Sequence, residues 1–443
     1  MGLALSLFVA LAACTGETAP PAKKAAPAAA SRTKAAASAA ASRRPSAGGD
    51  ATARSPAAGR VKKAPADGGA SKDVAAAPST RKTPALHRAP PPADVLAAVR
   101  RRLEAHVKAY AFRDPDNAWA IAHGLLALGP KMSEKERLKW ARKILAKAST
   151  RVVSGRTIPV VEGQAPDGTP LEPHEDLLLR SLLTVGVPLD LEFRAGGRRY
   201  TVRDLYEGAL WKFEPPHGGS WGAKAWTLLA IERALSMGEG DGTFVNHRGQ
   251  RLDARAMVRQ AAADLHERMR FLEETRDSGR PLVKRRQGIY AEPCGGFHFV
   301  QAIAAWGDEV PQLRGEISWE TDLLHYRLAA ERGVYAAAYQ SAPPSLHLLL
   351  TIQELKFYGH WLETLADLRD AGAKVDPGHV ALALEGLVGA VRRLEAAGAF
   401  DRMEEIDRRR HQSYLDLIGD SAHALRGLDA WRPDLKAAHP SQP

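Results

Sequence analysis

Cysteine and histidine side chains stand beside glycine pairs at two places in the chain, and these residue types can bind a transition metal or act as nucleophile and base. Cys294 precedes Gly295-Gly296, and His298 follows it by four residues. His217 precedes Gly218-Gly219 in the same way. Both stretches contain a proline and lead into apolar segments with helical spacing. We therefore expect two helix starts that form the two lips of one cavity.

Three interpretations of these residues remain open. His217, Cys294 and His298 would give a zinc ion three protein ligands and leave a fourth position free, as catalytic zinc sites require. Alternatively, Cys294 is a nucleophile and His298 its base, as in thiol-dependent hydrolases and transferases. In the simplest case both side chains only pack in the core. Whether the protein is an enzyme, and whether zinc is its cofactor, thus stays undecided by the sequence.

Aromatic and imidazole side chains near the same helix starts predict a pocket that could bind a ligand without catalysis. We expect this pocket to be lined by Trp119, His123, Trp221, Tyr290 and Phe297. Aromatic faces stack on sugars or hold a peptide, with polar groups at the rim. A glycan or a peptide from the cell envelope or its surroundings is therefore the expected ligand. The alternative is that the tryptophans belong to the hydrophobic core.

The N-terminus carries a short apolar run that ends in Leu11-Ala12-Ala13-Cys14. This pattern resembles the signal peptide of a bacterial lipoprotein with its lipobox. The resemblance implies that residues 1–13 are removed and that Cys14 is lipidated, for example with palmitate. The mature chain would then be anchored to a membrane of the cell envelope, on the periplasmic or outer-membrane side. The run is far shorter than the ~20 residues of a spanning helix.

Residues 14–93 are rich in Ala, Pro, Lys, Arg and Ser and contain no aromatic residue, so we expect a disordered tether. From Thr15 to Ala93 there are 14 Lys and Arg residues and four acidic residues, which account for +10 of the net charge of +11. The basic charge thus belongs to the tether, and we expect no nucleic-acid binding by the folded domain. The tether would lie along anionic envelope polymers or serve only as a soluble spacer.

Residues 94–443 show apolar residues at helical spacing and few strand signals, so we predict one all-α domain with minor β-hairpins. Two stretches, 197–205 and 249–257, align at an offset that gives Thr201 and Asp253 the same N-cap position. This repetition predicts stacked helical hairpins. The expected helices are 94–112, 117–128, 133–149, 174–184, 201–212, 220–236, 253–276, 296–307, 317–333, 344–371, 376–397 and 401–431, the last broken near Gly419.

The layout of these helices resembles the α/α-toroid proteins, which include terpenoid cyclases, protein prenyltransferases and lanthionine cyclase-like proteins. Helices that begin near Trp119, Trp221 and Phe297 are the most apolar, as inner helices of a toroid are, whereas those at 253–276 and 376–397 are amphipathic. Glu292-Pro293-Cys294 is similar to the Asp-x-Cys zinc pair of the prenyltransferases. The resemblance implies a closed ring of helical hairpins with one central pocket, in a chain that we expect to be a monomer.

Overall fold

The computed structural model describes residues 82–165, 168 and 170–431. The expected signal segment 1–13, Cys14 and most of the expected tether lie outside the described residues, so the structure does not bear on them. Most described residues are helical, and the strands form only small two-stranded antiparallel hairpins. The prediction of a helical domain with hairpin decorations is confirmed. Of the helices in this part of the chain, none is long and apolar enough to cross a membrane.

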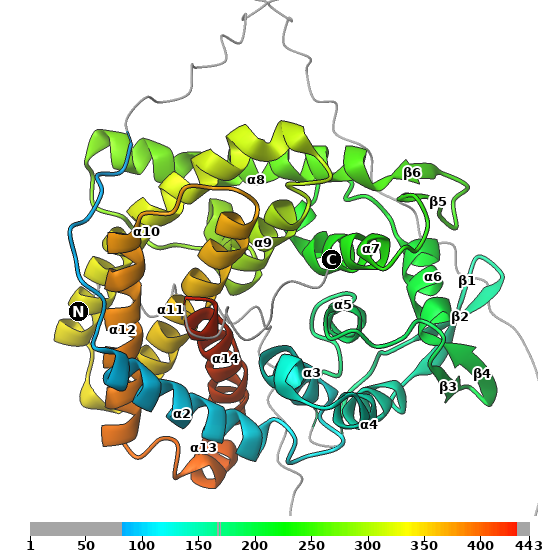
Figure 1. The fold of residues 1–443 in the computed structure, drawn as a ribbon, viewed down its shortest axis with the longest axis horizontal. Coiled ribbons are helices and arrows are strands. Elements are labelled where there is room, and N and C mark those ends of the chain that lie inside the picture. Colours follow the sequence, from blue (N-terminus) through cyan, green and yellow to red (C-terminus); the bar gives the residue numbers. More distant parts are fainter. Residues whose placement is uncertain (1–81, 166–167, 169, 432–443) are drawn as a thin grey trace, which may run out of the picture. The chain divides into compact units, whose positions relative to one another are not determined.

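The helices and strands follow one another along the chain as Figure 1 shows. The helices are α2 Ala93–Tyr110, α3 Ala118–Leu128, α4 Glu134–Leu145, α5 Leu177–Thr184, α6 Val202–Lys212, α7 Ala225–Ser236, α8 Ala254–Ser278, α9 Phe297–Ala305, α10 Arg314–Ser341, α11 His347–Asp370, α12 Pro377–Ala396, α13 Met403–Arg409 and α14 His411–Ala430. The strands are β1 Ser149–Val153, β2 Arg156–Val160, β3 Glu192–Ala195, β4 Arg198–Thr201, β5 Thr243–Val245 and β6 Arg251–Asp253.

A hairpin followed directly by a capped helix occurs twice, at the two stretches that align in sequence. Strands β3 and β4 lead into α6, where the hydroxyl of Thr201 accepts a hydrogen bond from the amide of Asp204 at 3.2 Å. Strands β5 and β6 lead into α8, where Asp253 accepts from the amide of Ala256 at 2.9 Å. Both residues are N-caps, as the alignment predicts, and each satisfies an amide that the first helical turn leaves unpaired.

The domain contains fully buried, apolar helices and amphipathic helices that cover them, and the two kinds differ in sequence. Helix α3 is apolar on all sides and nearly every residue of it is buried, whereas α8 buries one stripe that includes Val258, Leu265 and Leu272. Helix α3 contacts α5, α5 contacts α7, α7 contacts α9, α9 contacts α11, α11 contacts α14, and α14 contacts α3. Amphipathic helices such as α8 and α10 cover this set from outside, and Figure 1 shows α14 (red) beside α11, α2 and α3.

Three tryptophans connect neighbouring helices through their indole N–H groups. Trp306, directly after α9, donates to the backbone oxygen of Leu228 in α7 at 3.2 Å. Trp361 in α11 donates to Leu324 in α10 at 2.9 Å, and Trp431, directly after α14, donates to Leu362 in α11 at 2.9 Å. Each bond satisfies a polar group that would otherwise be costly to bury.

The last expected helix is interrupted at a different residue from the predicted one. We expected a break near Gly419, but α13 ends at Arg409 and α14 runs through Gly419 without interruption. The glycine is explained by packing instead, because a Cβ atom there would lie 2.6 Å from a ring carbon of Trp119. The break falls at Arg410, whose φ of −151° is not helical.

Residues 82–92, the end of the stretch that we expected to be disordered, have no helix or strand but are tied to the helical domain. The amide of Thr83 donates to Asp322 at 2.9 Å, and the amide of Leu86 donates to Asp376 at 3.2 Å. At Gly378, a Cβ atom would lie 1.7 Å from the backbone oxygen of Leu86. The N-terminal segment therefore lies directly on the start of α12.

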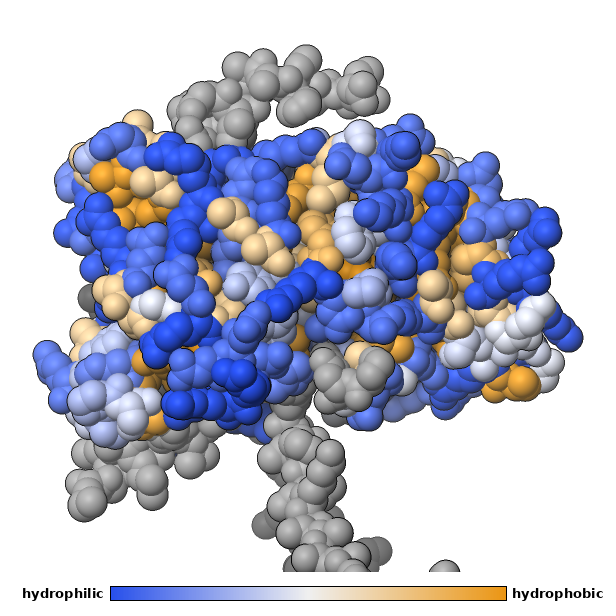
Figure 2. Space-filling view, turned by 90° about the horizontal axis from the view of Figure 1, so that it is seen from below, coloured by the Kyte–Doolittle hydropathy of each residue, from blue (hydrophilic) through white to orange (hydrophobic). Residues whose placement is uncertain are grey.

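Hydrophilic residues dominate the face of the domain shown in Figure 2, and hydrophobic residues appear there only in small separate groups. The large hydrophobic side chains that are exposed in the described residues lie far apart in sequence: Val152, Met237, Val245 and Val283. That face therefore carries no broad apolar patch.

Candidate metal centre

A left-handed turn places Cys294 directly before α9. Cys294, Gly295 and Gly296 have φ values of 51°, 62° and 79°, so three consecutive residues lie in the region that favours glycine. For a cysteine this conformation costs about 1–3 kcal/mol, and such strain persists only where the surroundings enforce it. The turn therefore presents the thiol at a cost in stability, which is characteristic of functional positions.

A buried network of charged residues, centred on Arg327 and Glu331, stabilises this turn. Nη1 of Arg327 donates to the backbone oxygen of Gly295 at 2.8 Å, and its guanidinium lies 4.2 Å from the ring centre of Phe297. Arg327 also pairs with Glu331, which accepts from Lys284 at 2.7 Å and from the hydroxyl of Tyr290 at 2.8 Å. Glu331 is fully buried, so its carboxylate compensates two buried cations.

Cys294, His298 and His360 form a group in which one potential ligand atom of each residue lies within 4.8 Å of the others. Cys294 is partly exposed, whereas both histidines are buried. The structure thus brings together Cys294 and His298, as the sequence predicts, but it adds His360 from α11. The expected third ligand, His217, is exposed on the loop between α6 and α7 and is not part of this group among the described residues.

Both histidines of the group are oriented through Nδ1. His360 forms a 2.9 Å bond with the backbone oxygen of Lys356, and His298 forms a 2.8 Å bond with Oε1 of Gln301. Because both partners are acceptors, Nδ1 carries the proton and Nε2 keeps its lone pair. Nε2 of His360 is buried and has no hydrogen-bond partner among the described residues. A buried nitrogen of this kind is suited to binding a metal, with the second nitrogen fixed as metal-ligating histidines require.

Burial keeps these imidazoles neutral. It lowers the pKa of His298, of His360 and of the neighbouring His423 well below the ordinary value, and the other imidazoles add to the effect. Burial also lowers the pKa of His123 to about 4. Neutral imidazole is the form that binds a metal, so these side chains are ready to act as ligands at neutral pH without losing a proton.

Two further histidines and an ion pair surround the group. The ring centre of His423 lies 3.9 Å from that of His360, and Nδ1 of His423 lies 2.6 Å from Oε2 of Glu363. Glu363 also pairs with Arg426. Nδ1 of His123 lies 2.8 Å from the backbone oxygen of Trp119. The inner helices thus collect a compact set of neutral imidazoles with one carboxylate behind them.

The expected aromatic pocket is only partly assembled. Trp119 and His123 lie beside the imidazoles, with 5.3 Å between the ring centres of His123 and His423. Tyr290 and Phe297 are both 2% exposed and pack around Arg327, so they belong to the core that supports the turn. Trp221 is also buried and lies beside Phe213. These positions favour the alternative interpretation of the aromatic residues as core.

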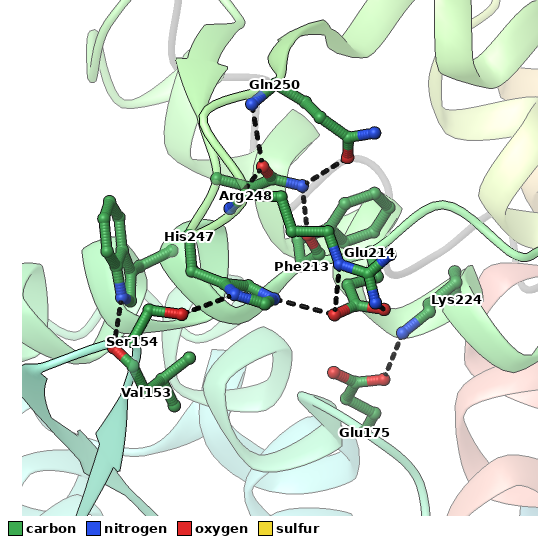
Figure 3. A network of polar contacts seen from close by, with 11 residues as sticks. Val153, Ser154, Glu175, Phe213, Glu214, Lys224, His247, Arg248 and Gln250 are labelled. Carbon is green, nitrogen blue, oxygen red and sulfur yellow. Dashed lines mark hydrogen bonds and ion pairs between the residues drawn. The ribbon is translucent and has the colours of Figure 1, made fainter.

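A second polar cluster lies at the turn of the first hairpin, and Figure 3 shows it. The hydroxyl of Ser154 lies 2.9 Å from Nδ1 of His247, and Nε2 of His247 lies 2.7 Å from Oε1 of Glu214. Arg248 donates to both oxygens of Glu214, at 3.0 and 2.6 Å. Ser154 is exposed and has a φ of 47° in the tight turn before Gly155. The cluster therefore joins the turns of the β1–β2 and β5–β6 hairpins to the loop after α6, and the guanidinium of Arg248 pairs with both oxygens of Glu214.

Four residues of this site, all from α11 and α14, were not among the predicted site residues: His360, His423, Glu363 and Arg426. His360 stands in the run Phe357-Tyr358-Gly359-His360-Trp361, where a histidine amid apolar residues is the only local signal. Gly359, directly before it, lies where two helices approach closely, because a Cβ atom there would lie 2.7 Å from the backbone of Ala424 in α14. Close approach of these two helices is what brings His360 and His423 together.

Comparison with protein-family models, curated proteins and solved structures finds no match to this chain.

Proposed function

We propose that the helical domain is a zinc-dependent enzyme of the hydrolase or transferase class, with Cys294, His298 and His360 as ligands. The observation that supports this most directly is the pair of imidazoles whose Nδ1 atoms are held by acceptors beside a strained cysteine. One sulfur and two nitrogen ligands suit zinc and leave a fourth position open. A zinc ion there would supply a Lewis acid that polarises a substrate carbonyl.

The protein's own residues would contribute orientation and electrostatics. Gln301 and the Lys356 carbonyl fix the ring planes of the two histidines. The left-handed turn aims the Cys294 sulfur, and Arg327 keeps that turn in place. His423 packs its ring against that of His360, with 3.9 Å between the ring centres, and is itself held by Glu363, so this pair limits movement of the His360 ring.

We also propose that the helices of this domain close into an α/α toroid, which holds the metal ligands in its interior. The support is the sequence of helix contacts that returns from α14 to α3, with amphipathic helices outside. In such a ring the ligands come from helices far apart in sequence, here α11 and the start of α9. An experimental structure with α14 separated from α3 would contradict this arrangement.

We further propose that the chain acts at the cell envelope as a lipoprotein, with lipidated Cys14 as its membrane anchor and the basic segment as its tether. The support is the lipobox pattern and the composition after it. Two acyl chains anchor firmly, because each buried methylene contributes about 0.8 kcal/mol. Replacing Cys14 by serine should move the full chain from the membrane fraction to the soluble fraction; retention in the membrane would refute the anchor.

The metal content of the full-length chain, purified without chelator, tests the zinc proposal. We expect close to one zinc per chain, and its loss in the Cys294→Ser and His360→Ala variants. His217→Ala is the matched control, because His217 follows a proline and precedes a glycine pair, just as Cys294 does, but does not belong to the group. A wild-type chain without bound metal, or a loss of zinc in the control equal to that in His360→Ala, would overturn this ligand set. Copper in place of zinc would keep the ligands but replace the proposed chemistry.

A cysteine nucleophile is the second candidate, because the same geometry places a thiol beside two imidazoles. Alkylation by iodoacetamide separates the two. A zinc-bound thiolate should be protected until a chelator removes the metal, whereas a catalytic thiol should react equally fast with and without chelator. Equal rates in a chain that holds no metal would favour the thiol enzyme.

A further inference from the structure

A cavity of about 460 Å³ lies where the C-terminal halves of α5, α7, α9, α11 and α14 meet. Its volume is within the range of about 300–1,000 Å³ that small-molecule sites occupy. One wall is formed by Gln301, the residue whose Oε1 atom holds His298. The cavity therefore lies next to the candidate metal centre, but different side chains line it.

Arg180 is the unusual feature of this cavity. It is only 7% exposed, and its guanidinium has no hydrogen bond or ion pair with any residue in the described part of the chain. Burial lowers its pKa to about 10, so the group stays charged at neutral pH. A guanidinium without a protein partner must obtain its hydrogen bonds from whatever fills the cavity that it lines. An anion inside the cavity would supply them.

The other side chains that line the cavity argue against a ligand that carries only negative charge. Two other arginines line the cavity: Arg426 is already paired with Glu363, and Arg233 donates to the backbone oxygen of Leu183. The carboxylates of Asp367 and Glu232 line the cavity without a hydrogen bond or ion pair among the described residues. In addition, the carbonyl ends of several helices meet here, and helix C-termini favour positive charge. One part of the cavity thus needs an anion and another part favours a cation.

A ligand that carries both charges fits these two requirements. We propose that the cavity binds a free amino acid or a short peptide with unblocked ends, whose carboxylate pairs with Arg180 and whose ammonium group pairs with Asp367. The planar guanidinium can hold a carboxylate through two parallel hydrogen bonds. An ammonium group beside Asp367 would stabilise the ionised carboxylate, whose pKa burial and Glu363 raise to about 7.

Calorimetric titration of the full-length chain tests the ligand class. The probes are single amino acids and unblocked di- and tripeptides, each compared with its N-acetylated and C-amidated forms. Arg180→Gln should weaken binding of free carboxylates about tenfold or more and leave the amides unchanged. Asp367→Asn should weaken only ligands with a free ammonium group. Arg392→Gln is the control, because Arg392 is exposed and lines a different cavity.

Three outcomes would overturn the proposal: no probe binds, free and blocked forms bind alike, or sulfate competes as well as the best zwitterion. Binding by single amino acids alone, or by peptides alone, identifies the source within the proposal. The Cys294→Ser variant should keep its ligand affinity, so a failure of the zinc proposal would not be mistaken for a failure of this one.

The melting temperature of Arg180 variants, measured without added ligand, gives a second test of the proposal. If Arg180 awaits a ligand, then Arg180→Met removes an uncompensated buried charge, and the melting temperature should rise. If Arg180 instead stabilises the fold through Glu363 and Asp367 at longer range, the melting temperature should fall, which would contradict the proposal. Arg180→Lys, which keeps the charge but not the planar fork, should lose affinity without this rise.

Discussion

Nη1 of Arg327 lies 2.8 Å from the backbone oxygen of Gly295, so a buried guanidinium holds the left-handed turn that carries Cys294. Arg327 is in turn compensated by Glu331, four residues later on α10. The position of the candidate ligand therefore depends on an ion pair outside the metal centre.

Replacing Glu331 by glutamine should destabilise the protein by about 3–5 kcal/mol, because Arg327 and Lys284 then stay buried without a counter-charge. The control is Glu385→Gln, whose half-exposed partner Arg88 should make the change cost at most about 1 kcal/mol. Denaturant unfolding measures both. Equal unfolding midpoints for the two variants would contradict the role of Glu331.

The stability difference between the wild type and the Glu331→Gln variant should depend on pH. Burial would raise the pKa of Glu331, but Arg327 and Lys284 outweigh it and lower the pKa to about 2. The contribution of this carboxylate is thus fully present above its ordinary pKa of 4.5 and is lost as pH falls towards 2. The difference in unfolding free energy between wild type and Glu331→Gln should therefore shrink below pH 4.5.

Gly296→Ala and Gly219→Ala should differ, although both residues are the second glycine of a pair. Gly296 has a φ of 79°, and a Cβ atom there would lie 2.2 Å from Cδ1 of Ile289. Gly219 lacks a positive φ, and its nearest contact would be 3.7 Å away. We expect a loss of about 2 kcal/mol or more for Gly296→Ala and less than about 0.5 kcal/mol for Gly219→Ala. Similar losses in chemical denaturation would show that the two turns are equivalent.

Cys294→Gly should be more stable than Cys294→Ser by about 1 kcal/mol when a chelator is present, because glycine adopts a φ of 51° without strain. Neither variant should retain the metal. Unfolding curves with and without zinc distinguish the two effects, since zinc should stabilise only the wild type. A glycine variant that is less stable than the serine variant would mean that the turn relaxes and stores no strain.

Gln301→Ala should lower zinc affinity by about 10- to 100-fold while leaving the ligands in place, because Gln301 fixes the ring of His298. Gln353→Ala is the matched control: Gln353 is also buried, but its Nε2 atom has no hydrogen-bond partner among the described residues. Competition with a chromophoric chelator measures both affinities. Equal affinities would mean that Gln301 does not position the ligand.

Thr201→Ala and Asp253→Ala should each cost about 1 kcal/mol, the usual value of an N-cap side chain. The loss should be larger for Thr201, because its hydroxyl also donates to Asp204 at 2.8 Å within a capping box, and alanine removes that bond as well. Asp190→Ala serves as the exposed control. Thermal unfolding of the three variants gives the comparison, and a cap variant no less stable than the control would remove the stated basis for the repeat.

Local signals were predictable from the sequence, and contacts between distant segments were not. Thr201 and Asp253 were identified as N-caps because capping depends on a few neighbouring residues. Strands β1, β4 and β6 were not predicted individually, and in β4 and β6 the arginines of Arg198-Arg199 and Arg251 hide the alternation that marks a strand. The helix break was misplaced because Gly419 makes room for Trp119, which is 300 residues away in the sequence.

The residues of the candidate site also divide into those with a local sequence signal and those that only helix packing brings together. Cys294 and His298 lie close in sequence and remain close in the fold. His217 was grouped with them because both stretches pair a proline with two glycines, but α7 begins only at Ala225, after a short 3-10 helix at Trp221–Lys224. That helix separates His217 from the helix start, whereas α9 begins three residues after Cys294. His360 and Arg180 enter through helix packing, which has no local signature.

The indole hydrogen bonds of Trp306, Trp361 and Trp431 give the domain a set of built-in optical reporters. Each indole is tied to a backbone oxygen of a neighbouring helix, and Trp306 and Trp361 are fully buried. If two of these helices separate, the indole between them meets water and its fluorescence emission shifts to the red. The junctions α9 to α7, α11 to α10 and α14 to α11 can therefore be followed in solution without any added dye.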